Sequence, residues 1–324
     1  MQAGVNGVLR QCRVGPLYTG GTLSIAPLIG PATTGDGPLP LQRVPAGSKF
    51  RLSEMDGQAR VEEIQVFNGT SRPLVALEGD LLAGGFQDRI VRVSAWVPRR
   101  AAAVLPTACS EEGRFAGAET AMQPSGMVAS PRFRRRLRLA FHGGGVGASE
   151  PSQRAVWDDI ESDRRLLEVA GDGISLVALR RLTRPRCAVL AAGVRPHSSE
   201  IGWLFFVEGR FVAADLFFHA SLPEAFREAL LEAAAYDALI ESLRRGPVTA
   251  WDIELADRSL DGFWRSLLAE LDAGLTVRDE SCAGTVQLRF ESPSLAGSLL
   301  LDGPRPVHMS LFPALYAEDL PTLA

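Results

Sequence analysis

The spacing of apolar residues changes along this chain, and this change limits the folds that the chain can adopt. Short apolar or alternating runs, typical of β-strands, dominate the first part of the chain: 22–29, 48–52, 61–67 and 73–77. Three longer stretches repeat their apolar residues at helical spacing: 151–169, 223–244 and 259–273. Strands and helices do not alternate regularly, so the pattern argues against a doubly wound parallel sheet.

We therefore predict a strand-rich α+β fold with largely antiparallel sheets, of sandwich or barrel type, and three helices in the second half. Further strands are expected at 90–97, 186–192, 201–207, 210–218, 285–290, 298–301 and 306–312. Because no linker separates two halves, residues 1–324 are predicted to form a single large domain. Residues 1–20 are expected to be an irregular lead-in. Residues 116–132 are rich in Gly, Ala, Ser and Pro and are expected to be an exposed loop.

An arginine-rich segment follows that loop. Five arginines fall within residues 132–138. Phe133, Leu137, Leu139 and Phe141 stand at alternating positions around them, which predicts a strand with one basic, solvated face. A patch that binds anions is the alternative interpretation.

Composition and charge narrow the class of protein. Hydrophobic residues make up 46% of the chain and charged residues 22%, as in ordinary folded proteins. The net charge of −4 gives no general attraction to nucleic acid or to an anionic membrane, and no apolar run is long enough for a membrane span. The cysteines are far apart, without the spacing of a zinc or redox motif: Cys12, Cys109, Cys187 and Cys282. Free thiols suit a reducing compartment, so we expect a cytoplasmic protein.

Polar residues are concentrated in the stretch 78–115, around the apolar run 90–97. The members with chemical potential are Glu78, Asp80, Gln87, Asp88, Arg89, Cys109, Glu111, Glu112 and Arg114. An acidic turn, a glycine pair, a polar triplet, a buried strand and a polar loop together make a framework for a site. The sequence therefore places the candidate site here.

Two pairs of carboxylates could serve in catalysis. Glu78 with Asp80, or Glu111 with Glu112, could act as a general acid and base or bind a hard cation such as Mg²⁺. Alternatively, Glu78 and Asp80 flank a tight turn, and an arginine neutralises one of them. We take Glu78 and Glu111 as the catalytic candidates and predict no metal site.

Three further residues are candidates for ligand binding. Gln87 and Arg89 are two residues apart and therefore share one side of a strand, where they could hold a phosphate or carboxylate. Arg114 could do the same from the loop that follows. A hydrogen-bond network that ties the turn to the loop is the alternative. The sequence leaves the identity of any cofactor open.

Cys109 is the candidate nucleophile of this stretch. A thiolate requires a nearby base or positive charge, which an arginine could supply; a buried, inert thiol is the alternative. The histidines lack zinc-ligand spacing. His308 is our choice for a catalytic histidine, against a core histidine bonded to backbone.

Several motifs resemble one known family. EGDLLAGGFQDR, LPTACSEEGRF, SQRAVWDDI, IGWLFFVEGRFVAADLFF and PVHMSLFP resemble, in order, the domain family named for its association with ADP-ribosylglycohydrolase and rhodanese-phosphatase domains. Asp88 stands where the family has asparagine. The resemblance implies a role in NAD or ADP-ribose metabolism.

Two functions are therefore expected as alternatives. One is a protein that binds or processes an ADP-ribose-, NAD- or other nucleotide-like phosphate ligand. The other is a non-catalytic module that accompanies partner enzymes of ADP-ribose metabolism. The sequence alone leaves open whether the chain is an enzyme.

Overall fold

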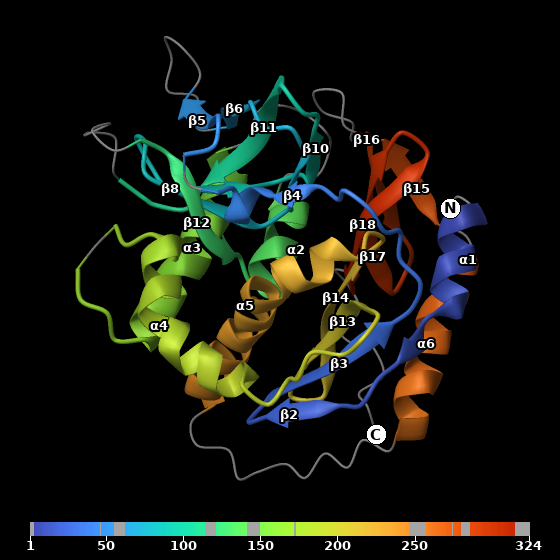
Figure 1. Ribbon diagram of the computed structural model, residues 1–324. Helices are drawn as coiled ribbons and strands as arrows, with labels where there is room; N and C mark the ends of the chain where they lie inside the picture. Colours follow the sequence, from blue (N-terminus) through green and yellow to red (C-terminus); the bar gives the residue numbers. More distant parts are fainter. Residues whose placement is uncertain are drawn as a thin grey trace.

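The fold is built around a nine-stranded antiparallel sheet (Figure 1). The computed structural model describes residues 3–45, 47–54, 62–113, 121–140, 150–171, 173–245, 257–273, 275–279 and 286–314. The strands of this sheet are β1 (Arg13–Val14), β2 (Tyr18–Gly20), β3 (Leu23–Ile29), β13 (Glu200–Val207), β14 (Arg210–Phe217), β15 (Thr276–Asp279), β16 (Val286–Glu291), β17 (Leu295–Asp302) and β18 (Arg305–Pro313). Their spatial order is β1-β3-β13-β14-β18-β17-β16-β15, with β2 beside β3.

Two smaller sheets come from the segment between β3 and the first long helices. One has six strands: β5 (Phe50–Glu54), β6 (Glu63–Asn68), β8 (Asp80–Ala83), β9 (Arg89–Val91), β11 (Ala101–Cys109) and β12 (Gln123–Val128). The other has three: β4 (Leu39–Pro40), β7 (Leu74–Ala76) and β10 (Ala95–Val97). Residues from both, such as Val66 and Val97, share one hydrophobic core. Of these described strands, β4 and β7 pair in parallel, whereas the ladders of the nine-stranded sheet are antiparallel.

Helices cover both faces of the nine-stranded sheet. They are α1 (Ala3–Gln11), α2 (Pro131–Ala140), α3 (Glu150–Leu166), α4 (Leu176–Ala191), α5 (Ser221–Arg245) and α6 (Asp257–Asp272), with a short 3₁₀ turn, η1 (Leu41–Arg43). Leu204 and Phe206 of β13 pack with α1 and α6, whereas Trp203 and Phe205 pack with α5 on the other face. Side chains of successive strand residues point to opposite faces, so coverage of both faces explains why β13 is apolar throughout. None of the helices in the described ranges is both long and apolar enough to cross a membrane.

The predicted α+β class with mostly antiparallel sheets is confirmed. The helices expected at 151–169, 223–244 and 259–273 are α3, α5 and α6. The hairpin expected at 201–218 is β13–β14, and Glu208 and Gly209 at its turn have φ of 52° and 73°. A two-residue turn whose twist matches that of the flanking strands requires positive φ at both positions.

The expected helix count was too low, because α1, α2 and α4 were missed. Residues 3–11 form α1, and β1 and β2 follow, so 1–20 is not an irregular lead-in. The arginine-rich segment is α2 rather than a strand. Phe133 and Leu137 are one helical turn apart and buried, which satisfies a helix as well as a strand.

The run expected as a strand at 186–192 is instead the end of α4, which ends at Ala191. Leu179, Thr183 and Cys187 recur every four residues on its buried face. The Ser175 side chain caps the helix by accepting a hydrogen bond from the Ala178 backbone N–H at 3.1 Å. Within the predicted run, Cys187 lies on this buried face, whereas Val189 is exposed.

Two further boundaries differ from the prediction. The run 90–97 is split into β9 and β10, which lie in different sheets, because the chain turns at the buried polar residues Arg92 and Ser94. The loop expected at 116–132 contains β12, paired with β8, and the start of α2. Residues 116–120 of that loop lie outside the described residues.

Candidate functional site

The arginine-rich helix α2 sends its side chains in two directions. Arg134 and Arg138 lie one turn apart and reach the nine-stranded sheet, where both are buried. Arg132 and Arg136, also one turn apart, contact α3 instead. Because α2 lies between the small sheets and the nine-stranded sheet (Figure 1), its two faces reach two separate charged clusters.

The first of these lies between α2, the turn before β8 and the nine-stranded sheet, and we call it the interface cluster. Its members are buried polar side chains: Glu78, Asp80, Arg134, Arg138, Asp215, Ser298, His308 and Ser310. The strand register accounts for the sheet side, because Asp215 lies opposite Ser310, and Ser310 lies opposite Ser298. His308 is two residues from Ser310 and therefore on the same face of β18.

Asp215 is shared by Arg134 and His308. Arg134 donates two hydrogen bonds to this carboxylate, at 2.8 and 2.7 Å, and His308 Nε2 lies 2.9 Å from Asp215 Oδ1. Burial alone raises the pKa of Asp215, but Arg134 and then His308 outweigh it and hold that pKa below its ordinary value. Burial lowers the pKa of His308, and Asp215 offsets this only in part. The arrangement is an ionised carboxylate between a guanidinium and a neutral imidazole.

Arg138 joins the small sheets to the nine-stranded sheet. It donates to Glu78 at 2.5 Å and to the Ser298 and Ser310 hydroxyls at 2.7 and 3.0 Å. Ser298 and Ser310 also lie 3.0 Å apart, so one guanidinium holds a carboxylate and a pair of hydroxyls. The interface cluster therefore places an anion and two neutral hydroxyls within hydrogen-bond distance of one cation.

The turn from Leu77 to Asp80 positions Glu78 against α2. The Leu77 backbone N–H donates to the Asp80 side chain, and the Asp80 N–H donates to the Leu77 carbonyl, both at 2.9 Å. Gly79 has a φ of +99°, and a Cβ built on it would lie 2.7 Å from Arg134 Cγ. Only glycine suits both this conformation and this approach of the helix. Burial raises the pKa of Asp80 to about 7, although hydrogen bonds and Arg134 oppose it.

Several buried polar atoms of this region have no hydrogen-bond partner among the described residues. They include Glu78 Oε1, His308 Nδ1 and both amide atoms of Gln287. Gln287 lies opposite Leu300 on β17, which lies opposite His308, so it shares the face of the sheet that bears His308. A buried polar group without a hydrogen-bond partner destabilises the folded protein. Such atoms therefore indicate an ordered water or a ligand.

The residues predicted from the 78–115 stretch form a second group, the signature cluster: Gln87, Asp88, Arg89, Cys109 and Glu111. Strands β9 and β11 bring them together, since Arg89 lies opposite Cys109. Arg89 Nη1 donates to Gln87 Oε1 at 2.8 Å, and Cys109 Sγ lies 3.1 Å from the same oxygen. Cys109 Sγ also lies 2.8 Å from the Glu111 carbonyl oxygen.

The signature cluster is tied to α3 and α4. Gln153 of α3 bridges the Cys109 backbone, accepting from its N–H at 2.9 Å and donating to its carbonyl at 2.8 Å. The Asp88 carboxylate accepts from the Gly84 N–H at 2.9 Å and from the Ser175 hydroxyl at 2.6 Å. The first contacts hold the start of α3 against the end of β11, and the Ser175 bond holds the start of α4 against the turn between β8 and β9. Gln87 and Arg89 thus take part in a hydrogen-bond network between the turn and the loop, which is the alternative to ligand binding.

Burial raises the pKa of the Cys109 thiol, and hydrogen bonding to Glu111 and the charge of Arg89 oppose it only in part. A buried thiol of raised pKa is a poor nucleophile, so this environment favours the inert alternative. Glu78 lies in the interface cluster, bonded to Arg138, rather than with Cys109. Arg114 lies outside the described residues. The roles expected for Gln87, Arg89 and Glu111 stay predictions.

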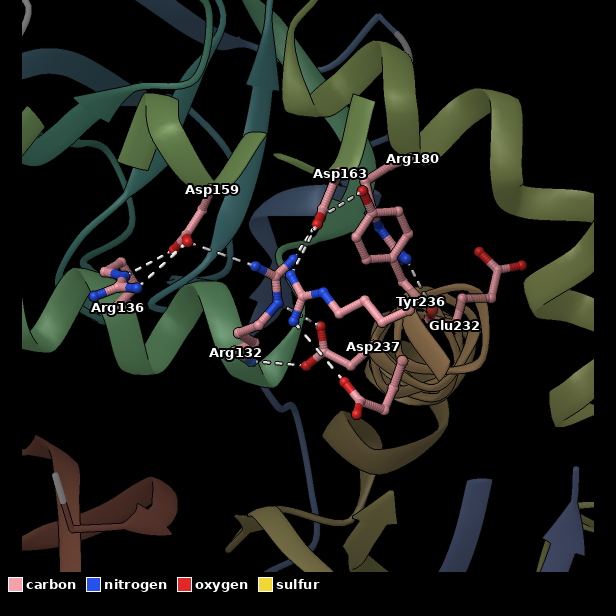
Figure 2. Close-up of polar contacts among 10 residues, drawn as sticks. Arg132, Arg136, Asp159, Asp163, Arg180, Glu232, Tyr236 and Asp237 are labelled. Carbon is pink, nitrogen blue, oxygen red and sulfur yellow. Dashed lines mark hydrogen bonds and ion pairs between the residues drawn. The ribbon is translucent and has the colours of Figure 1, made fainter. Parts of the chain in front are cut away.

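The face of α2 that bears Arg132 contributes to a third group, the Arg132 cluster (Figure 2). Its members are Arg132, Asp159, Asp163, Tyr236 and Asp237. The Arg132 guanidinium lies among three carboxylates, those of Asp159, Asp163 and Asp237, and its closest contact is with Asp163. The Tyr236 hydroxyl donates to Asp163 at 3.0 Å. Figure 2 shows the carboxylates converging on Arg132 from α3 and α5. This cluster fastens three helices together.

The sequence profile of one protein family, the ARG and Rhodanese-Phosphatase-superfamily-associated Protein domain, matches residues 11–312. The chain belongs to this family. No curated protein and no solved structure matches the chain. The resemblance expected from the motifs is therefore confirmed over nearly the whole length of this family member.

The motifs that resemble the family contribute side chains to the same clusters in the folded chain. Segment 152–160 supplies Gln153 to the signature cluster and Asp159 to the Arg132 cluster, while Tyr236 reaches the latter from α5. Segment 306–313 supplies His308 to the interface cluster. Among the described residues, no group of three or more His, Cys, Asp and Glu side chains is arranged to hold a metal ion.

Most of the interface cluster was not predicted from the sequence. Asp215, Ser298 and Ser310 lie within apolar strands and were not among the predicted site residues. A signal was present, because Ser310 is two residues from His308 and both interrupt the apolar side of their strand. The arginines of α2 were assigned to solvent, because their carboxylate partners are distant in sequence.

Proposed function

We propose that this chain binds an ADP-ribose- or NAD-related phosphate ligand at the interface cluster and processes it there. The observation that carries the proposal is the pair of unpaired buried atoms, Glu78 Oε1 and His308 Nδ1, in the cluster that contains Arg138. A guanidinium that can hold a phosphate thus shares a cluster with two groups that can move protons. The association for which the family is named supports the ligand class.

The chemistry of the cluster suits a phosphoryl group. Arg138 with the Ser298 and Ser310 hydroxyls provides donors for phosphate oxygens. A bound phosphate takes the place of Glu78 on Arg138 and so releases a carboxylate beside the ligand. Access requires the small sheets to separate from the nine-stranded sheet where β10 contacts β16 and β17.

Calorimetric titration with ADP-ribose and NAD tests the proposal. We expect binding by the wild type and at least a tenfold loss of affinity in Ser310→Ala and Arg138→Lys. Arg136→Ala is the matched control, since Arg136 lies on the same helix but pairs with Asp159. Absence of binding by the wild type, or equal affinity in all variants, would contradict the proposal. Chromatography of the incubated ligands separates processing from binding.

A non-catalytic module that accompanies enzymes is the second candidate. It is favoured by the internal contacts of the signature cluster and by two exposed apolar side chains on one face of α4, Leu182 and Val189. In that case Arg89→Ala lowers thermal stability without any effect on ligands. Leu182→Asp with Val189→Asp then abolishes a complex with an ADP-ribosylglycohydrolase that the wild type forms in size-exclusion chromatography.

A further inference from the structure

His308 is held in one orientation by its neighbours. Its Nε2 atom lies 2.9 Å from Asp215 Oδ1, and Arg134 fixes that carboxylate by hydrogen bonds to both oxygens. The ring packs against Phe217, with centroids 4.8 Å apart, and Phe217 stacks on Phe226. The imidazole therefore cannot turn without breaking a buried hydrogen bond and an aromatic contact.

This arrangement determines which nitrogen carries the proton. Because an ionised carboxylate accepts hydrogen bonds and cannot donate, the proton resides on Nε2, which donates to Asp215. The other nitrogen, Nδ1, then carries a lone pair. It is buried and has no partner among the described residues. The free lone pair thus lies in the same buried layer as the donors of Arg138 and Ser310.

The charges that face His308 come from three elements. Burial has the largest effect on its pKa and lowers it, Asp215 on β14 raises it, and smaller effects come from Arg134 on α2, which lowers it, and Glu78 in the turn before β8, which raises it. The ring is consequently neutral at neutral pH. A neutral imidazole with an oriented lone pair is able to accept a proton, and a carboxylate on its other nitrogen stabilises the imidazolium that results.

We infer that His308 is the general base, and Asp215 its positioning residue, for hydrolysis of a phosphate ester or anhydride held by Arg138, Ser298 and Ser310. This inference rests on the proposed function. A water molecule gives a proton to Nδ1 while its oxygen forms a bond to phosphorus. The bond from phosphorus to the leaving oxygen breaks, that oxygen takes a proton from solvent, and the imidazolium returns its proton to solvent.

Two measurements on the whole chain test the inference. In ¹⁵N-resolved NMR of the ligand-free protein, His308 should be the Nε2–H tautomer with an unprotonated Nδ1. In Asp215→Asn the amide can donate to Nε2, so we expect the opposite tautomer to be populated. An Nδ1–H tautomer in the wild type overturns the inference without reference to any ligand. An unchanged tautomer in Asp215→Asn overturns the positioning role.

The second measurement compares binding with hydrolysis of ADP-ribose. His308→Gln keeps an N–H for Asp215 but lacks the basic ring nitrogen, so affinity should stay within about twofold while hydrolysis falls by roughly 10²–10⁴-fold. The wild-type rate should also rise with pH through a group that is absent from His308→Gln. Arg136→Ala should leave both quantities unchanged. Binding without a loss of hydrolysis in His308→Gln overturns the inference and leaves the proposed function standing. Absence of binding by the wild type overturns the proposed function itself.

Discussion

Arg138 and Glu78 form an ion pair at 2.5 Å, buried between α2 and the turn that precedes β8. The exposed fractions of their side chains are 7% and 0%, so water screens neither charge. Buried pairs of this kind contribute little net stability over an apolar replacement, but the loss of one partner leaves an uncompensated charge. The pair therefore matters most through what happens when only one member is removed.

Removal of one partner of this pair should be severely destabilising. We expect Arg138→Met to lower the free energy of unfolding by about 3–5 kcal/mol, because Glu78 is left buried and charged. Urea denaturation measures this change. Arg136→Ala, whose side chain is 42% exposed, should lower it by no more than about 1 kcal/mol. A double variant, Glu78→Gln with Arg138→Met, should be more stable than Arg138→Met alone; equal stability would argue against an uncompensated charge.

Gly79 offers a test of how closely α2 packs on the turn. Gly79→Ala should cost about 1–3 kcal/mol for the positive φ alone. It should cost more in total, because the new Cβ would meet the Arg134 side chain. Gly126→Ala is the control, since Gly126 has a φ of +78° but open space around its Cβ position. If urea denaturation gives the same loss for both variants, the close approach is not supported.

Asp80 should make stability depend on pH. Its pKa in the folded chain is about 7, above the unfolded value of 3.8. The folded state therefore binds the proton more tightly, and the associated stability is present below pH 4 and lost as the pH rises through 7. Relative to the wild type, Asp80→Asn should gain stability between pH 4 and 8, by at most about 4 kcal/mol.

Unfolding free energies of the wild type and Asp80→Asn across that pH range provide the measurement. The asparagine oxygen can still accept from the Leu77 N–H, so the turn is retained. Burial also raises the pKa values of Asp163 and Asp237, but both titrate in each protein and cancel in the difference. A difference that does not vary with pH would mean that Asp80 titrates normally.

Asp88 should tolerate asparagine but not alanine. Its two oxygens accept from Gly84 and Ser175, and an asparagine can keep the first bond while donating to the Ser175 hydroxyl. Asp88→Ala leaves both groups without that partner and should cost about 1–3 kcal/mol. Thermal unfolding of the two variants distinguishes them. If Asp88→Asn is as unstable as Asp88→Ala, the negative charge itself is needed.

Local patterns were sufficient to predict the elements whose neighbours are close in sequence. The β13–β14 hairpin follows from the apolar runs around Glu208-Gly209, and α5 follows from its helical spacing and from Pro223 in its first turn. The contact between Gln87 and Arg89 was also predictable, because the two residues are only two positions apart in the chain. In each case the deciding contacts lie within a few residues.

The elements that depend on distant partners were not predictable in this way. α2 was assigned to a strand with a solvated face because its arginines have no carboxylates nearby in sequence. Asp215 and Ser310 are on strands that become adjacent only in the folded sheet. The role of Glu78 likewise depends on Arg138, and no pattern in the sequence near Glu78 indicates that contact. Buried charge can be recognised only once its counter-charge is located.

The sequence separations within the interface cluster have a consequence for the order of folding. Arg138 is 60 residues from Glu78, 160 from Ser298 and 172 from Ser310. Contacts between distant residues form only after the entropy of closing long loops has been overcome. We therefore expect the β13–β14 hairpin to form before the cluster, and Arg138 to meet its distant partners late in folding. Until then its guanidinium would remain in water, which would help to keep this part of the chain soluble while the sheets assemble.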